Sequence, residues 1–270
     1  MSPTNTWKAK WAVVTGASAG VGKALATELA AGGANLVLTA RRVERLEQLA
    51  ASLRAQHGIR AEVCRADLAK PQGPQEVFDF CRQKHIDADI LINNAGFGRY
   101  GEFRGADLAR LLDMVQVNCA AVVALTRLFL PAMVERRRGY VLIVASTAGF
   151  QAVPYLTTYG ATKGFDLLFA EGLAEEMRPY GVRVCVLCPG STESEFAQVA
   201  GQPERTVRVQ ETAEKVARTG LRALAAGKHC VISGMSNRLG MEVQRLLPRR
   251  LVTGMTAKMF RPKKEGGKGG

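Results

Sequence analysis

The chain has 270 residues, of which 47% are hydrophobic and 23% charged, and its formal net charge is +13. This length is enough for one large α/β domain with a substantial core. The six cysteines and three histidines lack metal-ligand spacing, so we expect no metal site. The basic residues are not interleaved with aromatic ones, which argues against a nucleic-acid-binding protein.

Strand-like and helix-like segments alternate along the whole chain. We expect strands at 11–15, 35–39, 60–64, 89–92, 140–145, 182–187 and 229–232. We expect helices near 21–31, 42–56, 74–84, 107–136, 157–178 and 212–226. This alternation predicts a doubly wound α/β fold, in which helices cover both faces of a parallel sheet. No linker divides the chain, so we expect a single domain.

Three further patterns bear on location and on cysteine chemistry. Met1 to Lys10 is polar, unlike a signal peptide, and the apolar stretch from Cys119 to Val134 is interrupted by a charged residue and a proline. We therefore read that stretch as a buried helix and expect a cytoplasmic protein. Cys185 and Cys188 fall on an expected strand, where they should point to opposite faces, which argues against a redox or zinc site.

A glycine-rich turn, Thr15 to Gly22, joins the first expected strand to the first helix. Its sequence, TGASAGVG, allows a tight turn and a close approach of the backbone to a ligand. The free N–H groups and positive end of the following helix favour a phosphate. The turn can also be purely structural, but its βαβ context favours a nucleotide-binding role.

Tyr159 and Lys163 lie at i and i+4 of an expected helix, on one face of it. A lysine cation beside a tyrosine favours the phenolate, which would lower the pKa of the tyrosine toward the range of a general acid/base. Taken alone, such a pair is more often an ordinary half-buried helix face. Its companions elsewhere in the sequence favour a functional role.

Six motifs in order resemble the short-chain dehydrogenase/reductase family, over about residues 8 to 235. They are the glycine turn, Asn93 to Gly96, Asn118, Ser146 thirteen residues before Tyr159, the Tyr159–Lys163 pair, and Pro189-Gly190. The resemblance implies a Rossmann-type fold and hydride transfer between a nicotinamide and a carbonyl or secondary alcohol. Family members commonly pair through the helices corresponding to 107–136 and 157–178, which implies a homodimer or homotetramer.

The resemblance also implies roles for four catalytic residues. Tyr159 would exchange a proton with the substrate oxygen, and Ser146 would donate a hydrogen bond to that oxygen. Lys163 would lower the pKa of Tyr159 and bind the nicotinamide ribose. Asn118 would interrupt its helix and hold a water that links Lys163 to solvent.

The second expected strand ends at Arg41 and Arg42, without the carboxylate that accepts hydrogen bonds from the ribose of NAD. Guanidinium groups would instead hold the 2′-phosphate of NADP(H), which we therefore expect as the cofactor. The alternative is that both arginines simply begin the second helix. The expected cofactor contacts are Gly16, Ser18, Gly20, Val21, Gly22, Arg41, Arg42, Asp67, Leu68, Asn94, Ala95, Gly96, Tyr159, Lys163, Pro189, Gly190, Thr192 and Ser194.

Residues 195–209 lie where the family places a mobile substrate loop. With the apolar residues near the C-terminus, this loop suggests a hydrophobic carbonyl substrate, such as a 3-oxoacyl-like compound. Fold alone does not decide the substrate.

Beyond a dinucleotide-binding domain at 1–236, we expect a basic amphipathic helical extension at 237–262 and a disordered tail at 263–270. From Arg245 to Gly270 there are eight Lys/Arg and one acidic residue, a net charge of +7. Four interpretations of residues 240–264 stay open: a helix packed on its own domain, a lid, a subunit contact and a peripheral membrane contact. Two other functions therefore stand beside a soluble reductase: a dinucleotide-binding regulator without turnover, and a reductase tethered to a membrane surface.

Overall fold

A single parallel sheet forms the centre of the computed structural model, which describes residues 6–203 and 210–262. Its seven strands follow the order β3-β2-β1-β4-β5-β6-β7. The strands are β1 (Trp11–Thr15), β2 (Asn35–Ala40), β3 (Ala61–Arg65), β4 (Ala88–Asn93), β5 (Gly139–Val144), β6 (Val182–Cys188) and β7 (Cys230–Ile232). The doubly wound fold expected from the sequence is thus confirmed, with each strand within two residues of its expected bounds.

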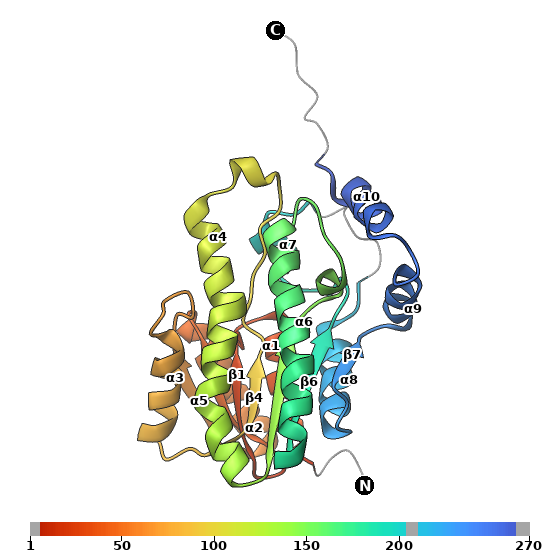
Figure 1. The fold of residues 1–270 in the computed structure, drawn as a ribbon. Coiled ribbons are helices and arrows are strands. Elements are labelled where there is room, and N and C mark those ends of the chain that lie inside the picture. Colours follow the sequence, from red (N-terminus) through yellow and green to blue (C-terminus); the bar gives the residue numbers. More distant parts are fainter. Residues whose placement is uncertain (1–5, 204–209, 263–270) are drawn as a thin grey trace.

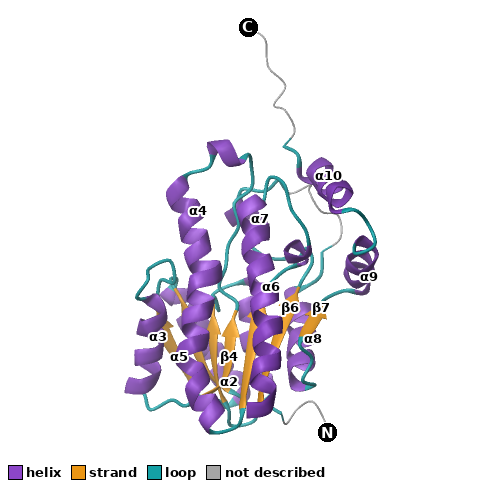
Figure 2. Cartoon of the chain, in the orientation of Figure 1, coloured by secondary structure: helices purple, strands orange, loops and turns teal. Residues whose placement is uncertain are grey.

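Helices cover both faces of this sheet, as Figures 1 and 2 show. One face carries α1 (Gly20–Ala31), α2 (Val43–His57) and α8 (Ala213–Ala225). The other carries α3 (Gly73–Gln83), α5 (Ala121–Glu135) and α6 (Thr157–Met177). The two apolar cores meet opposite faces of the same strands, because successive strand side chains alternate in direction.

The alternation is visible at two pairs of residues. Val14 belongs to the core under α1, whereas its neighbour Val13 belongs to the core under α5. Cys185 and Cys188 divide in the same way, so the expectation that they point to opposite faces is confirmed. Both thiols are fully buried.

The order of the strands determines where a site can form. The chain builds β1, β2 and β3 outward, and then returns to place β4 on the other side of β1. At such a reversal, the chain continues from the carboxyl ends of two adjacent strands to opposite sides of the sheet, and ligands of open α/β sheets bind outside these ends. The glycine turn after β1 and residues 94–96 after β4 lie at these two ends.

A long helical stretch runs through α4 (Leu108–Val115), a π-helical segment (Gln116–Ala120) and α5. Asn118 lies in the π-helical segment, so the expected interruption of the helix at this residue is confirmed. Within the described residues, this stretch is long and apolar enough to cross a membrane, but 44% of its most apolar window is buried. It packs against α3 and against the strands β4 and β5, which is the environment of a core helix.

The C-terminal extension differs from the single helix that the sequence suggested. It forms two helices, α9 (Met235–Gln244) and α10 (Arg249–Phe260), with Pro248 at the N-cap of the second. Proline disfavours the helical conformation in the residue before it, so α9 ends and the chain changes direction. The expected tail at 263–270 lies outside the described residues.

Shorter helical segments complete the chain. Within residues 6–203 and 210–262, they are three 3-10 turns, Phe103–Gly105, Thr147–Phe150 and Arg178–Tyr180, and the short helix α7 (Phe196–Ala200). The last of these occupies part of the expected substrate loop, whose residues 204–209 lie outside the described part of the chain.

Candidate active site

The turn after β1 has the geometry of an anion-binding loop. Gly16 and Gly20 have φ of +66° and +52°, a region that residues with a side chain rarely adopt. Helix α1 begins directly after Ala19, which provides no side-chain cap, and its first turn has no acidic residue. The first N–H groups of the helix are therefore available to a ligand, and they lie at the positive end of its dipole. This arrangement fits the phosphates of a dinucleotide.

The same turn packs tightly against the loop after β4. A Cβ on Gly22 would lie 2.4 Å from Asn94 Nδ2, and one on Gly16 would lie 2.9 Å from Ala95 Cα. The buried Thr15 joins the two loops, because its Oγ1 accepts hydrogen bonds from the N–H groups of Asn94 and Ala95, each at 2.9 Å. Gly16 and Gly22 are thus required by internal packing.

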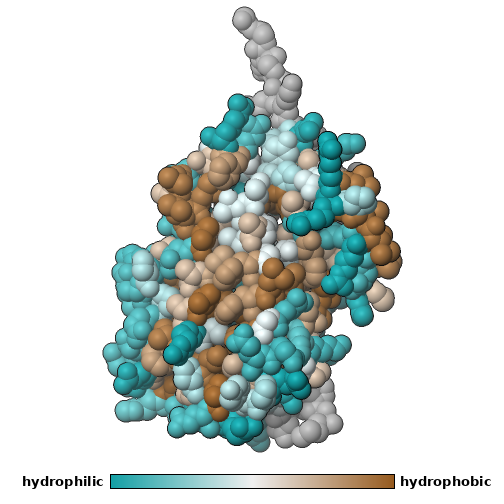
Figure 3. All heavy atoms as spheres, in the orientation of Figure 1, coloured by the Kyte–Doolittle hydropathy of each residue, from teal (hydrophilic) through white to brown (hydrophobic). Residues whose placement is uncertain are grey.

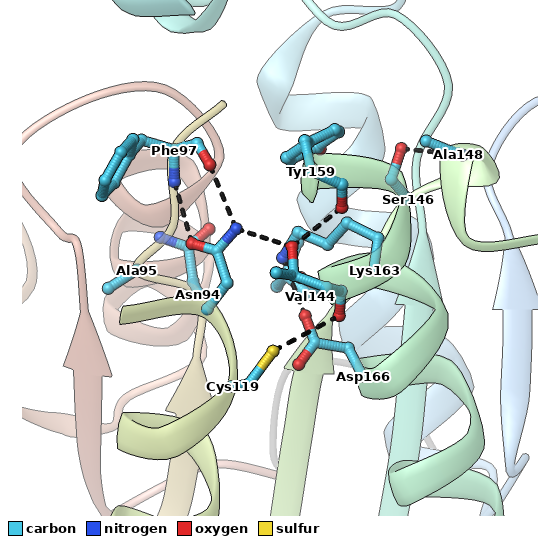
Figure 4. A network of polar contacts seen from close by, with 12 residues as sticks. Asn94, Ala95, Phe97, Cys119, Val144, Ser146, Ala148, Tyr159, Lys163 and Asp166 are labelled. Atoms are coloured by element: carbon cyan, nitrogen blue, oxygen red, sulfur yellow. Dashed lines mark hydrogen bonds and ion pairs between the residues drawn. The ribbon is translucent and has the colours of Figure 1, made fainter. Parts of the chain in front are cut away.

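The catalytic candidates converge at the carboxyl end of β5, as Figure 4 shows. Ser146 follows this strand, and Tyr159 and Lys163 lie on the first turns of α6. The ring of Phe196, from α7, packs on the ring of Tyr159 with centroids 4.9 Å apart. A Cβ on Gly96 would lie 3.5 Å from Lys163 Nζ, so the loop after β4 that packs on the glycine turn also approaches the lysine.

Lys163 is fixed by two buried acceptors. Its Nζ donates to Val144 O at 2.7 Å and to Asp166 Oδ2 at 2.9 Å, which leaves one N–H for another partner. The side chains of Lys163 and Asp166 are 6% and 1% exposed. Burial lowers the pKa of Lys163, but the charges of Asp166 and Tyr159 outweigh it, so its pKa lies above the usual value.

The net effect on Tyr159 is opposite to the one expected from the sequence. Burial raises the pKa of Tyr159, and it outweighs the lowering by Lys163 and by a hydrogen bond from Ser146. Asp166 and Cys188 raise this pKa further. The sequence showed the lysine, but it did not show the desolvation or the carboxylate that partly neutralises the lysine.

Asn118 joins the loop after β4 to α6. Its Oδ1 accepts from Phe97 N at 3.1 Å, and its Nδ2 donates to Phe97 O at 3.0 Å and to Thr162 Oγ1 at 2.9 Å. Thr162 immediately precedes Lys163 and is itself buried. The side chain of Asn118 therefore aligns the lysine-bearing helix with the loop between the two halves of the site.

Arg42 and Ser18 come together at the end of β2, where the sequence predicted a 2′-phosphate site. Nε and Nη2 of Arg42 donate to Ser18 Oγ at 3.3 and 3.1 Å. Arg42 also pairs with Glu195 at 2.7 Å, and Arg45 pairs with the other oxygen of Glu195 at 2.6 Å. Arg41 is exposed beside this group.

The remaining cofactor candidates lie along the same edge of the sheet. Asp67 follows β3, and its Oδ1 accepts from Ala69 N at 3.1 Å, as in a turn. The next residue, Leu68, is buried. After β6, the loop from Pro189 passes over the glycine turn, since a Cβ on Gly20 would lie 3.0 Å from Ser194 Cβ. Within that loop Thr192 Oγ1 donates to Gly190 O at 3.2 Å.

Two residues of this site, Arg45 and Asp166, were missed from the sequence, whereas Glu195 and Phe196 fall in the expected substrate loop at 195–209 but were not expected to contact the arginines or Tyr159. Asp166 stands three residues after Lys163, a spacing at which helical side chains meet, and this pattern was visible. Arg45 and Phe196 follow shortly after Arg42 and Ser194, which were expected cofactor contacts. Glu195 is 150 residues from Arg45, so no local pattern connects these two residues.

Comparisons with known proteins agree with this geometry. A family model described as short chain dehydrogenase matches residues 10–205. The very-long-chain 3-oxoacyl-CoA reductase of Anas platyrhynchos is 35% identical over 196 residues, which cover 70% of this chain and 62% of the duck protein. The chain thus spans less than two thirds of that relative's length.

Two solved structures are similar over nearly the whole chain. A short-chain dehydrogenase from Sphingobium yanoikuyae in complex with NADPH has a TM-score of 0.80 at 28% identity, covering 95% of this chain and 97% of that one. A 7β-hydroxysteroid dehydrogenase has a TM-score of 0.84 at 26% identity, covering 92% and 96%. Because the family model matches well over half of its 270 residues, the chain belongs to the short-chain dehydrogenase family.

Proposed function

We propose that this protein is an NADP(H)-dependent oxidoreductase that reduces the carbonyl group of a hydrophobic, 3-oxoacyl-like substrate. The observation that carries the proposal is the convergence of Ser146, Tyr159 and Lys163, which Figure 4 shows, next to the loop after β4 that packs on the glycine turn. A dinucleotide-binding regulator without turnover has no need of these three groups, nor of Asn118 holding their helix in place.

When bound, the dinucleotide supplies or accepts the hydride. Tyr159 gives a proton to the carbonyl oxygen in the reducing direction, and its phenolate removes the hydroxyl proton in the oxidising direction. Because burial raises the pKa of Tyr159, the phenol remains protonated, and this is the form that reduction requires. Ser146 donates a hydrogen bond to the same substrate oxygen, and the remaining N–H of Lys163 is available to the nicotinamide ribose.

The arginines at the end of β2 support NADP(H) over NAD(H). Ser18, Arg42 and Arg45 place a hydroxyl and two guanidinium groups at the end of β2. The strand β2 itself contains no carboxylate. Guanidinium groups bind phosphate with charge-assisted hydrogen bonds, and the absence of an acidic ribose ligand removes the main preference for NAD. The Sphingobium yanoikuyae structure, which is similar over 95% of this chain, contains NADPH.

The substrate class rests on Phe196 and on the similar proteins. Phe196 brings an aromatic ring against Tyr159, so the surroundings of the substrate carbonyl are apolar. The relative named a very-long-chain 3-oxoacyl-CoA reductase matches 70% of this chain, and the similar 7β-hydroxysteroid dehydrogenase is also named for a hydrophobic substrate. Both names fit a ketone on a long or bulky apolar body.

NADPH oxidation with a panel of 3-oxoacyl thioesters, steroid ketones and aromatic ketones tests the proposal. We expect turnover with at least one 3-oxoacyl compound, and we expect Tyr159→Phe to reduce kcat by about 10²- to 10⁴-fold. Tyr155→Phe is the control, because Tyr155 lies outside α6, in the turn four residues before Tyr159, and the variant should retain activity. NADPH binding without turnover of any panel member would favour the regulator.

Exposed apolar side chains on α4 and α6 support the expected homodimer or homotetramer. Leu108 and Leu112 on α4 are 67% and 59% exposed, and Leu168 on α6 is 71% exposed. Figure 3 shows apolar residues over α4 and between α5 and α6. Leu168→Glu should shift the molar mass measured by light scattering toward the monomer if this face joins subunits.

The helices α9 and α10 support a second property, contact with an anionic membrane surface. We name the exposed apolar residues of these helices and of the turn between them the α9–α10 surface: Met235, Leu239, Val243, Leu246, Leu251, Met255 and Met259, which are between 50% and 89% exposed. Six basic residues and one acidic residue, Glu242, accompany them between 235 and 262. Apolar faces with flanking positive charge bind anionic lipid bilayers. Figure 3 shows this patch at the side of the molecule.

The inner sides of the same two helices contact loops beside the catalytic residues. Gln244 Nε2 donates to Phe150 O at 3.3 Å, and Thr256 Oγ1 donates to Ala152 O at 3.0 Å. Tyr100 OH donates to Phe260 O at 2.9 Å. A bilayer on the α9–α10 surface would therefore lie close to the substrate end of the site, which suits a hydrophobic substrate.

Co-sedimentation with vesicles of phosphatidylserine and phosphatidylcholine tests this contact. We expect the double variant Leu239→Ser, Met255→Ser to bind these vesicles several-fold more weakly than the parent chain. Phe103→Ser is the control, since Phe103 is 65% exposed but lies on the 3-10 turn before α4. Unchanged vesicle binding with a change in molar mass would instead show that the α9–α10 surface is a subunit contact.

A further inference from the structure

The two carboxylate oxygens of Glu195 occupy two different arginines. Oε2 accepts from Arg42 Nη1 at 2.7 Å, and Oε1 accepts from Arg45 Nη1 at 2.6 Å. Glu195 belongs to the loop after β6, whereas both arginines lie at the start of α2. The two ion pairs therefore connect this loop with α2 across the end of β2. These arginines lower the pKa of Glu195 and hold it ionised.

This carboxylate stands where an anion of the ligand is expected. The other two nitrogens of Arg42 that form hydrogen bonds, Nε and Nη2, donate to Ser18 of the glycine turn. Arg42 and Arg45 therefore form one cluster of donors, which Ser18 joins to the glycine turn, and Glu195 is the anion bound to it. The three charged side chains are accessible enough to exchange partners, since those of Arg42, Arg45 and Glu195 are 44%, 47% and 38% exposed.

The residue after Glu195 reaches the catalytic tyrosine. Phe196 packs on Tyr159 at 4.9 Å between ring centroids, and it lies so close to Gly98 that a Cβ there would be 2.7 Å from Phe196 Cζ. Helix α7 begins at Phe196, so a displacement of Glu195 acts on the first residue of that helix. One short segment thus connects the arginine cluster with the ring that covers Tyr159.

We propose that Glu195 is an internal ligand of the 2′-phosphate site, that the cofactor phosphate displaces it from Arg42 and Arg45, and that its release frees Phe196 from the ring of Tyr159. The inference rests on the NADP(H) preference proposed above. It assigns two further specificity residues, Arg45 as a phosphate donor and Glu195 as the competing anion. It also makes the phosphate, rather than the nicotinamide, the group that opens the substrate side.

The size of the effect follows from the exposure of the pair. An exposed ion pair contributes at most about a fivefold change in an equilibrium constant, because water and salt screen it. Removing the charge of Glu195 should therefore strengthen binding of a 2′-phosphate by roughly three- to tenfold for the two pairs together. Binding of a nucleotide without this phosphate should change less than twofold.

Calorimetric titration of the full chain with 2′,5′-ADP and with 5′-ADP measures this competition without nicotinamide or turnover. We expect the parent chain to prefer 2′,5′-ADP, and we expect Glu195→Gln to bind 2′,5′-ADP more tightly while 5′-ADP is unaffected. Glu193→Gln is the matched control, because Glu193 is an exposed carboxylate two residues earlier in the same loop. It should behave as the parent chain does.

Hydrogen exchange of residues 196–201 measures the second step. In the parent chain, 2′,5′-ADP should accelerate exchange of this segment and 5′-ADP should not, whereas in Glu195→Gln exchange should be fast without any nucleotide. Equal or weaker binding of 2′,5′-ADP by Glu195→Gln would overturn the competition, while a retained preference for 2′,5′-ADP would leave the cofactor assignment standing. If the parent chain bound 2′,5′-ADP and 5′-ADP equally well, both the competition and the cofactor assignment would be overturned.

Discussion

Two ion pairs of nearly equal length lie at opposite ends of the site, in opposite environments. Lys163 and Asp166 are 2.9 Å apart, with side chains 6% and 1% exposed. Arg42 and Glu195 are 2.7 Å apart, with side chains 44% and 38% exposed. Water can replace either partner of the second pair at little cost, but neither partner of the first. The comparison indicates a fixed catalytic end and an exchangeable cofactor end.

Asp166→Ala should have the largest effect on folding. It leaves the ammonium of Lys163 buried with only Val144 O as a described partner, and breaking a buried pair in this way costs about 3–5 kcal/mol of unfolding free energy. Urea denaturation at neutral pH measures this loss. Glu175→Ala removes the acid of an exposed pair at the same i,i+3 spacing, with Arg178, and should leave the denaturation midpoint unchanged. Equal effects of the two variants would contradict the contrast between buried and exposed pairs.

Asp166→Asn should change the chemistry of Tyr159 with a smaller loss of stability. Asp166 raises the pKa of Tyr159, whereas Lys163 lowers it. Removing the negative charge while Lys163 remains protonated should therefore lower the pKa of Tyr159. In the oxidising direction, where the phenolate is the base, the rising limb of kcat/KM against pH should move to lower pH. Movement to higher pH would mean that Lys163 had lost its proton, and would contradict this role of Asp166.

The same contrast explains which features of the fold and of the site could be predicted from the sequence. The strands were predictable because each is a short apolar run between turn residues, and Ser146, Tyr159 and Lys163 were predictable because their spacing is local. Pro248 was visible too, although the break it causes between α9 and α10 was not predicted. The pair of Glu195 with Arg45 depends on how β2 and β6 are placed in the sheet, and the desolvation of Tyr159 depends on packing. Neither leaves a local pattern.

Arg42→Ala should affect binding rather than folding. The side chain loses its contacts with Ser18 and Glu195, which are exposed, so the free energy of unfolding should change by less than about 1 kcal/mol. NADPH binding, measured by quenching of protein fluorescence, should weaken by about tenfold, because one charge-assisted contact to the phosphate is lost. NADH binding should change little, because NADH has no 2′-phosphate. A parallel loss for both nucleotides would mean that Arg42 braces the glycine turn through Ser18, and the cofactor end would then be as fixed as the catalytic one.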